Sequence, residues 1–100
     1  MQRIVIFANG EIPDLEKVRL LLQPDDYMIC ADGGTRHALA LGLKPDLVIG
    51  DMDSIVHEEW LELENSKTPI EKFPRDKNAT DLELALKRAL DLQPRHLVVI

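Results

Sequence analysis

The sequence predicts an α/β domain with a doubly wound, mostly parallel sheet and helices on both faces, a Rossmann-like three-layer arrangement that we expect to be incomplete. Short apolar runs alternate with segments of helical period along the whole chain. This alternation requires crossover connections and therefore parallel strands. Aliphatic residues dominate and aromatic residues make up only 4% of the 100 residues, which is typical of strands that are covered on both faces.

The first strand is predicted over residues 3–8, a continuous apolar run that ends at Asn9-Gly10, as a buried strand followed by a turn does. Pro13 then suits the first turn of a helix, because its φ is fixed near the helical value and its missing N–H has no helical partner there. Apolar residues recur at helical spacing over residues 15–22. Pro24 ends this predicted helix.

A second strand is predicted over residues 27–31 and a third over residues 47–50. Gly33-Gly34 turns the chain into the helix that lies between them. Gly42 fits the position just past the end of that helix, where a left-handed backbone favours glycine. These elements predict a strand–helix–strand unit with two parallel strands.

Two more helices are predicted in the second half of the chain. Ser54 can cap the first, and Thr80 with Glu83 forms a capping box at the start of the second. Between them we expect a loop over residues 65–69 and an edge strand over residues 70–73, whose residues alternate between apolar and charged.

The last strand is predicted over residues 96–100, and the sequence ends inside this apolar run with no turn or cap after it. We therefore expect residues 1–100 to be one truncated domain, with further strands and ligand contacts beyond Ile100.

Net charge and cysteine content exclude some kinds of binding partner and some kinds of site for this chain. The net charge of −6 argues against a nucleic-acid partner, because phosphate backbones need a basic surface. A nucleotide is compatible with this charge, since a divalent cation can carry its phosphates. Cys30 is the only cysteine, so one chain has neither a disulfide framework nor a zinc cluster. No leader or long apolar segment is present, so we expect no membrane partner and a cytoplasmic location.

Acidic side chains follow the second and third predicted strands. Asp32 comes directly after residues 27–31, and Asp51 and Asp53 come directly after residues 47–50. Asp81, at the start of a helix, aims its carboxylate toward the same edge, where open parallel sheets bind ligands. Mg²⁺ prefers one or two carboxylates together with phosphate oxygens and water. The sequence therefore predicts a magnesium and phosphate site at this edge.

Each of these pieces also has a purely structural explanation. Gly33-Gly34 can serve only as a turn, although backbone N–H groups at a helix start also suit a phosphate. Asp32 or Ser54 can act only as a helix cap, and Asp81 is favourable near a helix N-terminus without any ligand. Three acidic signals at one end of the sheet favour the metal site over these separate explanations.

Three motifs together carry a resemblance to a known family. They are Ala31-Asp32-Gly33-Gly34, Gly50-Asp51-Met52-Asp53-Ser54 and Lys77-Asn78-Ala79-Thr80-Asp81. In this order and spacing they resemble the N-terminal catalytic domain of thiamine pyrophosphokinase, and the linking residues 41–49 are similar to that family too. The resemblance implies transfer of a diphosphoryl group from ATP to the thiamine hydroxyl, which gives AMP and thiamine diphosphate.

The resemblance also implies which residues act. Asp51, Asp53 and Asp81 are expected to hold Mg²⁺ and to be the catalytic residues. The residues expected around ATP and its metal are Asp32, Gly33, Gly34, Ser54, Asn78 and Thr80. Asn78 stands where the family usually has Asp, so its oxygen can ligate but brings no negative charge.

The family resemblance further implies a homodimer, with thiamine bound between this domain and the partner's C-terminal β domain. That thiamine-binding domain is absent from residues 1–100, and we expect this fragment to be inactive alone.

Two alternatives remain open at this point. Residues 48–56 resemble the nucleophile loop of a haloacid-dehalogenase-type Mg²⁺-dependent phosphatase, although that loop normally follows the first strand of its fold. A non-catalytic nucleotide-binding domain of the receiver type is the other alternative. Asn9-Gly10-Glu11 does not supply the acidic pair that a receiver needs after its first strand.

Overall fold

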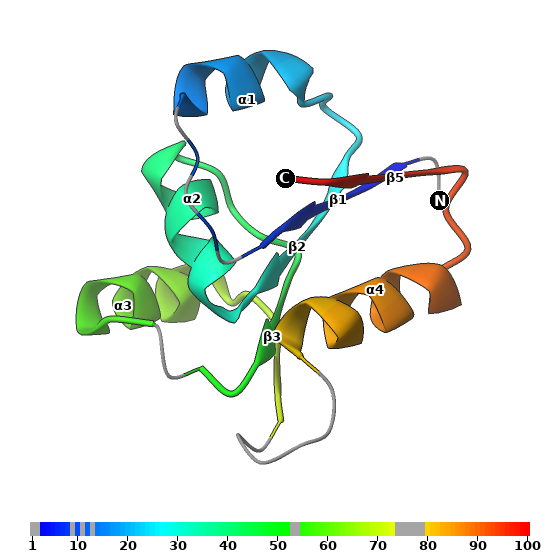
Figure 1. Cartoon of the computed structure of the whole chain (residues 1–100). Helices are drawn as coiled ribbons and strands as arrows, with labels where there is room; N and C mark the ends of the chain where they lie inside the picture. Colours follow the sequence, from blue (N-terminus) through cyan, green and yellow to red (C-terminus); the bar gives the residue numbers. More distant parts are fainter. Residues whose placement is uncertain (1–2, 9, 11, 13, 53–54, 74–79) are drawn as a thin grey trace.

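Strands and short helices alternate along the chain, as the apolar pattern predicts. The computed structural model describes residues 3–8, 10, 12, 14–52, 55–73 and 80–100. The elements are β1 (Arg3–Phe7), α1 (Leu15–Leu21), β2 (Tyr27–Ala31), the 3₁₀ turn η1 (Asp32–Gly34), α2 (Thr35–Ala40), β3 (Leu47–Gly50), α3 (His57–Ser66), β4 (Ile70–Lys72), α4 (Asp81–Asp91) and β5 (His96–Val99). All five predicted strands are present, and β1, β2, β3 and β5 are labelled in Figure 1.

The five strands form one sheet in the order β4-β3-β2-β1-β5, and every described pair is parallel. β4 lies at an edge, as its alternating sequence predicts. From β1 the strand order runs one way through β2, β3 and β4, and α4 then carries the chain back to β5 on the other side of β1. This reversal makes the sheet doubly wound, and ligands bind such sheets at the carboxyl ends of their strands.

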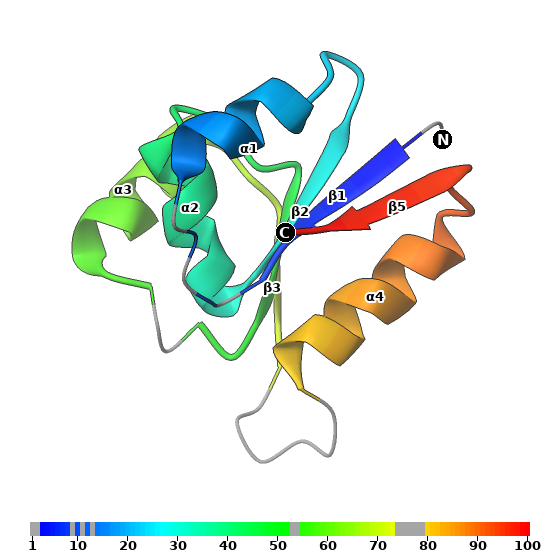
Figure 2. The same ribbon diagram turned by 45° about the horizontal axis from the view of Figure 1, so that its top comes forward.

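Helices cover both faces of the sheet, which confirms the predicted three layers (Figure 2). In β1, Val5 and Phe7 face the side of α1, α2 and α3, whereas Ile4 and Ile6 face α4. All four side chains are fully buried, because successive strand residues point to opposite faces. Two aliphatic cores result, one on each side of the sheet.

Two expectations about α3 were wrong. The helix begins at His57 with Val56 as its N-cap and not at the predicted position 54, which lies outside the described residues. The physical reason is that Glu59 reaches back and its carboxylate accepts a hydrogen bond from the Val56 N–H at 3.1 Å. The helix also continues to Ser66, so the connection to β4 is shorter than predicted and begins at Lys67, which has a left-handed φ of 56°.

The start of α1 also differs from the expectation. Pro13 lies outside the described residues, and the helix begins after it, at Leu15. Asp14 is the N-cap, and its carboxylate accepts hydrogen bonds from the N–H groups of Glu16 and Lys17 at 3.1 and 3.4 Å. An aspartate is among the best N-caps, because it satisfies N–H groups that have no helical partner.

Other predicted helix ends are confirmed. Gly42 follows α2 with a φ of +73°. Thr80 caps α4, where its hydroxyl accepts a hydrogen bond from the Glu83 N–H at 3.1 Å. No helix in the described part of the chain is long and apolar enough to cross a membrane.

Candidate metal centre

The carboxyl ends of β2 and β3 bring two acidic residues together. Ala31 pairs with Ile49 in the register of these strands, so Asp32 lies beside Gly50 and Asp51 follows it. Asp81 joins them as the first residue of α4. Asp32, Asp51 and Asp81 each offer a carboxylate oxygen, and these oxygens lie within 4.8 Å of one another. We call these three residues the acidic cluster.

The spacing of the acidic cluster fits a small divalent cation. Three atoms no more than 4.8 Å apart all lie within about 2.8 Å of some common point, compared with about 2.0–2.1 Å for an Mg²⁺–oxygen bond. Small movements of the carboxylates therefore bring all three into bonding range. Hard oxygen donors that carry negative charge are the ligands that Mg²⁺ prefers.

The three carboxylates differ in their surroundings. Asp32 is only 4% exposed, whereas Asp51 and Asp81 are half-buried. Asp81 also lies in the first turn of α4, where the helix dipole favours negative charge. Three carboxylates this close repel one another, and a bound divalent cation would offset that repulsion.

The backbone around the acidic cluster is strained. Asp32 has a φ of +40° and Met52 a φ of +67°, a region that costs side-chain-bearing residues about 1 kcal/mol or more. Gly50, between the two strand ends, has a φ of +142°. Such backbone outliers cluster at functional sites, where the surrounding structure holds them in place.

Gly50 also leaves room for the side chains of two residues of the acidic cluster, Asp32 and Asp81. A Cβ atom at position 50 would lie 3.0 Å from Asp32 Cβ and 3.0 Å from both Cγ and Oδ1 of Asp81. Real Cβ atoms are rarely this close to another atom. The space that a side chain at position 50 would fill is thus taken by Asp32 and Asp81.

Comparison with known proteins decides the family. A sequence model described as "Thiamin pyrophosphokinase, catalytic domain" matches residues 18–100. The chain belongs to this family. A thiamine pyrophosphokinase of Bacillus subtilis (strain 168) is 35% identical over 97 residues, which cover 94% of this chain and 44% of that protein.

Solved structures of thiamin pyrophosphokinases share the fold. The structure from Bacillus subtilis has a TM-score of 0.80 and 32% identity, and the match covers 99% of this chain and 46% of that one. The structure from Geobacillus thermodenitrificans has a TM-score of 0.79 and 27% identity, with coverage of 98% and 46%. The chain therefore spans less than half the length of these relatives.

Within the thiamin pyrophosphokinase fold, the described part of the chain brings together two of the three predicted metal ligands, Asp51 and Asp81. The third, Asp53, lies outside the described residues, as do Ser54 and Asn78. Asp32, which we expected near the cofactor, lies within the acidic cluster itself.

The remaining predicted site residues also have structural roles. The Thr80 hydroxyl accepts the capping hydrogen bond of α4. Gly33 and Gly34 are buried in η1. A Cβ at Gly34 would lie 1.9 Å from the carbonyl oxygen of Phe7, so the close approach of η1 to the end of β1 requires glycine there. These observations leave their predicted contacts with the cofactor as predictions.

Two residues of the same edge were missed from the sequence. Gly50 was noted only as part of a motif, and its contact with the acidic cluster depends on how closely α4 approaches β3. Lys72 ends β4 and pairs with Gly50 in the register, so its exposed side chain places a positive charge at this edge. Its only signal in the sequence is its position near the end of a predicted edge strand.

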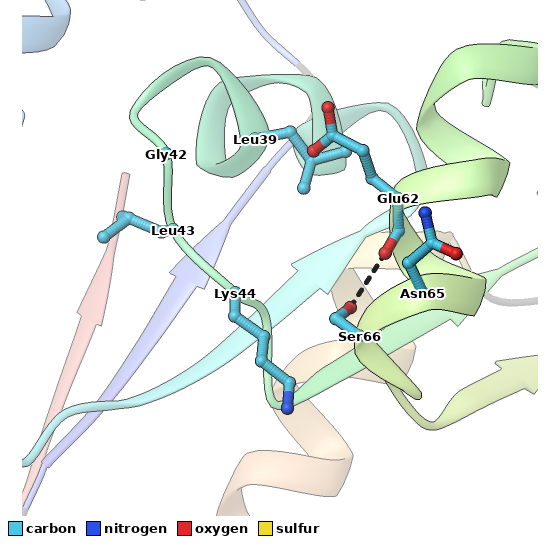
Figure 3. Close-up of a pocket in the computed structure, with 7 residues that line it drawn as sticks. All are labelled: Leu39, Gly42, Leu43, Lys44, Glu62, Asn65 and Ser66. Atoms are coloured by element: carbon cyan, nitrogen blue, oxygen red, sulfur yellow. Dashed lines mark hydrogen bonds between the residues drawn. The ribbon is translucent and has the colours of Figure 1, made fainter.

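A separate pocket of about 340 Å³ lies at the other end of the sheet. Figure 3 shows that it is formed by the end of α2, the turn that follows, and the last turns of α3. Lys44 precedes β3 and Ser66 precedes β4, and the Ser66 hydroxyl donates to the Glu62 carbonyl oxygen at 2.9 Å. This pocket is formed at the amino ends of the strands, so it is not part of the acidic cluster.

Proposed function

We propose that this chain forms the catalytic domain of a thiamine pyrophosphokinase, which transfers the diphosphoryl group of ATP to the hydroxyl of thiamine and releases AMP. The observation that carries the proposal is the acidic cluster, with carboxylate oxygens of Asp32, Asp51 and Asp81 within 4.8 Å of one another at the ligand-binding edge. Membership of the catalytic-domain family supports the same activity.

In this proposal the acidic cluster holds Mg²⁺, and Asp53 is a further ligand by the family resemblance. Mg²⁺ held there by Asp32, Asp51 and Asp81 would supply positive charge that offsets the charge of the phosphates and lowers the barrier to phosphoryl transfer. The protein itself mainly positions ATP and the attacking hydroxyl group, because phosphoryl transfer needs little other chemistry from side chains. Asp32 and Met52 follow β2 and β3, and their strained backbone fixes the direction in which the chain leaves these strands before substrate arrives.

The other residues of the edge act on the phosphates and the attacking hydroxyl. Asp81 completes the metal shell or orients the hydroxyl of thiamine, and Lys72 adds a positive charge for the phosphates of ATP. Gly33 and Gly34 bring backbone N–H groups close to the nucleotide. Asn78 offers the metal and the phosphates of ATP a neutral amide oxygen, at a position where the family usually has a carboxylate.

We further propose that the complete enzyme is a cytoplasmic homodimer in which thiamine lies between this domain and the partner's C-terminal domain. The chain spans less than half of its relatives' length, which is consistent with a second domain in the full-length protein. Residues 1–100 alone would then bind Mg²⁺ and ATP without turnover of thiamine.

The test is ³¹P NMR of the full-length protein with ATP, Mg²⁺ and thiamine. AMP together with thiamine diphosphate is the expected result, whereas release of inorganic phosphate would instead support the phosphatase alternative. Asp51→Asn should remove most of the turnover, because it removes a charge from the metal site. Asp91→Asn is the matched control, since it removes the same charge from an exposed residue at the far end of α4. Normal turnover by Asp51→Asn would contradict the proposal.

A further inference from the structure

Gly50 lies against two residues of the acidic cluster, Asp32 and Asp81, although it has no side chain. It ends β3, lies beside Asp32 in the sheet register, and lies against the carboxyl group of Asp81. Its φ of +142° lies in a region that residues with a side chain rarely adopt. Two separate features therefore require glycine at this position: the backbone conformation and the contacts that a Cβ would make.

We propose that Gly50 sets the width of the acidic cluster and thereby its preference for Mg²⁺ over a larger divalent cation such as Ca²⁺. The inference rests on the proposed function, in which the acidic cluster holds the metal. Gly50 acts here as a positioning residue, because it carries no ligand atom itself and works through Asp32 and Asp81.

The distances show why one methyl group matters. A Cβ at position 50 would lie 3.0 Å from atoms of Asp32 and Asp81, whereas ordinary van der Waals contact begins at 3.4 Å. Each side chain must then retreat by about 0.4 Å or more, which is similar to the difference of about 0.3–0.5 Å between Mg²⁺–oxygen and Ca²⁺–oxygen bonds. A cluster opened by this amount suits the larger ion.

Gly50 has little freedom to move away from its neighbours. Its carbonyl oxygen accepts a hydrogen bond from the Phe73 N–H at 2.7 Å, and the preceding residues of β3 are buried in the sheet. The contact at Asp32 is with Cβ, next to the main chain, so a rotation of the carboxyl group does not relieve it. The added methyl group must therefore displace Asp32, and it must move or rotate the carboxyl group of Asp81.

The two ions also differ in how strictly they demand geometry. Mg²⁺ requires near-ideal octahedral coordination, whereas Ca²⁺ accepts six to eight oxygen ligands in flexible arrangements. Displacing two of three carboxylates should therefore weaken Mg²⁺ binding more than Ca²⁺ binding. A general loss of folded protein would lower the Mg²⁺ and Ca²⁺ affinities by the same factor. A change in the ratio of the two affinities therefore indicates a change in the width of the acidic cluster.

The experiment measures Mg²⁺ and Ca²⁺ dissociation constants by isothermal titration calorimetry in the full-length protein. We expect Gly50→Ala to weaken Mg²⁺ binding about tenfold, as loss of a residue that supports metal ligands does, and to weaken Ca²⁺ binding less. Gly42→Ala is the matched control. Gly42 also has a positive φ, +73°, but its added Cβ would meet nothing within 4 Å, so this variant carries backbone strain without touching the acidic cluster.

Each outcome distinguishes the inference from the proposed function. An unchanged ratio of Mg²⁺ to Ca²⁺ affinity in Gly50→Ala would overturn the inference. Absence of Mg²⁺ binding by the unmodified protein would instead contradict the proposed function.

If Gly50→Ala folds but is too unstable for titration, a double-mutant cycle of unfolding free energies replaces the titration. Asp81→Ala removes two of the atoms that the new methyl group would meet, so Gly50→Ala should destabilise the protein less in that background than in the unmodified one. Equal destabilisation in both backgrounds would also overturn the inference.

Discussion

Replacing Asp32 by asparagine tests whether this residue belongs to the metal site. Asparagine has nearly the same shape and keeps an oxygen that can bind a metal, so the change removes only the negative charge. Asp32 is 4% exposed and one of its oxygens lies within 4.8 Å of those of Asp51 and Asp81. We expect Asp32→Asn to weaken Mg²⁺ binding as strongly as Asp51→Asn does.

The size of the effect follows from the spacing of the acidic cluster. With the dielectric constant of water, Coulomb's law gives about 3 kcal/mol between a divalent cation and one carboxylate charge about 2.8 Å away, which is roughly a hundredfold in affinity. Asp32 is buried, and a lower local dielectric constant makes its attraction for the cation stronger than in water. A loss of about a hundredfold or more is therefore expected.

The assay is calorimetric titration of Mg²⁺ into the Asp32→Asn, Asp51→Asn and Asp91→Asn variants at pH 7. Asp91 lies at the C-terminal end of α4, about 15 Å along the helix from Asp81 at 1.5 Å per residue. Asp91→Asn therefore reproduces the change in net charge without touching the site. If Asp32→Asn binds Mg²⁺ as tightly as Asp91→Asn, the assignment of Asp32 to the metal site is refuted.

Three further predictions concern stability. Gly34→Ala should lower the free energy of unfolding by about 3 kcal/mol or more, because its methyl group would lie 1.9 Å from the Phe7 carbonyl oxygen. Asp26→Ala should lower it by about 2 kcal/mol in urea denaturation, since Arg3 donates two hydrogen bonds of 2.9 Å to this carboxylate. Burial raises the pKa of the Cys30 thiol. Stability should therefore fall above about pH 8.5, where an unfolded cysteine ionises, by up to about 1.4 kcal/mol per pH unit.

Each of these predictions has a control. Gly10→Ala should leave the free energy of unfolding nearly unchanged, because its Cβ would meet nothing within 4 Å. If Gly34→Ala lowers the free energy of unfolding no more than Gly10→Ala does, the steric argument is contradicted. For the ion pair, a change below about 0.5 kcal/mol in Asp26→Ala would place it with ordinary surface pairs. For the thiol, the stability of the Cys30→Ala variant should not fall above about pH 8.5. If its stability falls with pH as in the unmodified protein, another group causes the fall.

The sheet could be predicted from the sequence because buried parallel strands have a clear pattern. Residues 27–31 and 47–50 are short apolar runs bounded by turn residues, and the structure places β2 and β3 there. The fold class follows from the alternation of such runs with helices. Local signals of this kind need no knowledge of distant contacts.

The helix starts were harder to predict, because several residues near each one can serve as caps. Asp14 and Ser54 are both good cap residues by type, but α1 begins after Asp14 whereas the N-cap of α3 is Val56. At α3 the helix starts at His57, since Glu59 satisfies the Val56 N–H without a capping side chain before it. Which candidate is used depends on where the following helix packs, and this is a tertiary property.

The candidate site could be predicted as an edge but not as a set of distances. The position of Asp32 and Asp51 after two parallel strands indicates that they share an edge. Their separation depends on the register of β2 and β3, and the approach of Asp81 depends on how α4 packs against β3. Gly50 matters only through this approach, so its role was missed.

Different parts of one sheet serve stability and the proposed function: the two aliphatic cores stabilise the fold, and the acidic cluster at the strand ends forms the candidate metal site. β1 is fully buried on both faces apart from Arg3, and its burial supplies stability that does not depend on the strand ends. The carboxyl edge, by contrast, combines a buried Asp32, left-handed backbone at Asp32 and Met52, and three carboxylates at close range. These features oppose folding individually, and they persist because the packed strands hold the ends of β2 and β3 in register. A cation that binds the assembled edge, and not the unfolded chain, would then recover part of that opposing free energy, so metal binding and the stability of this edge should be coupled.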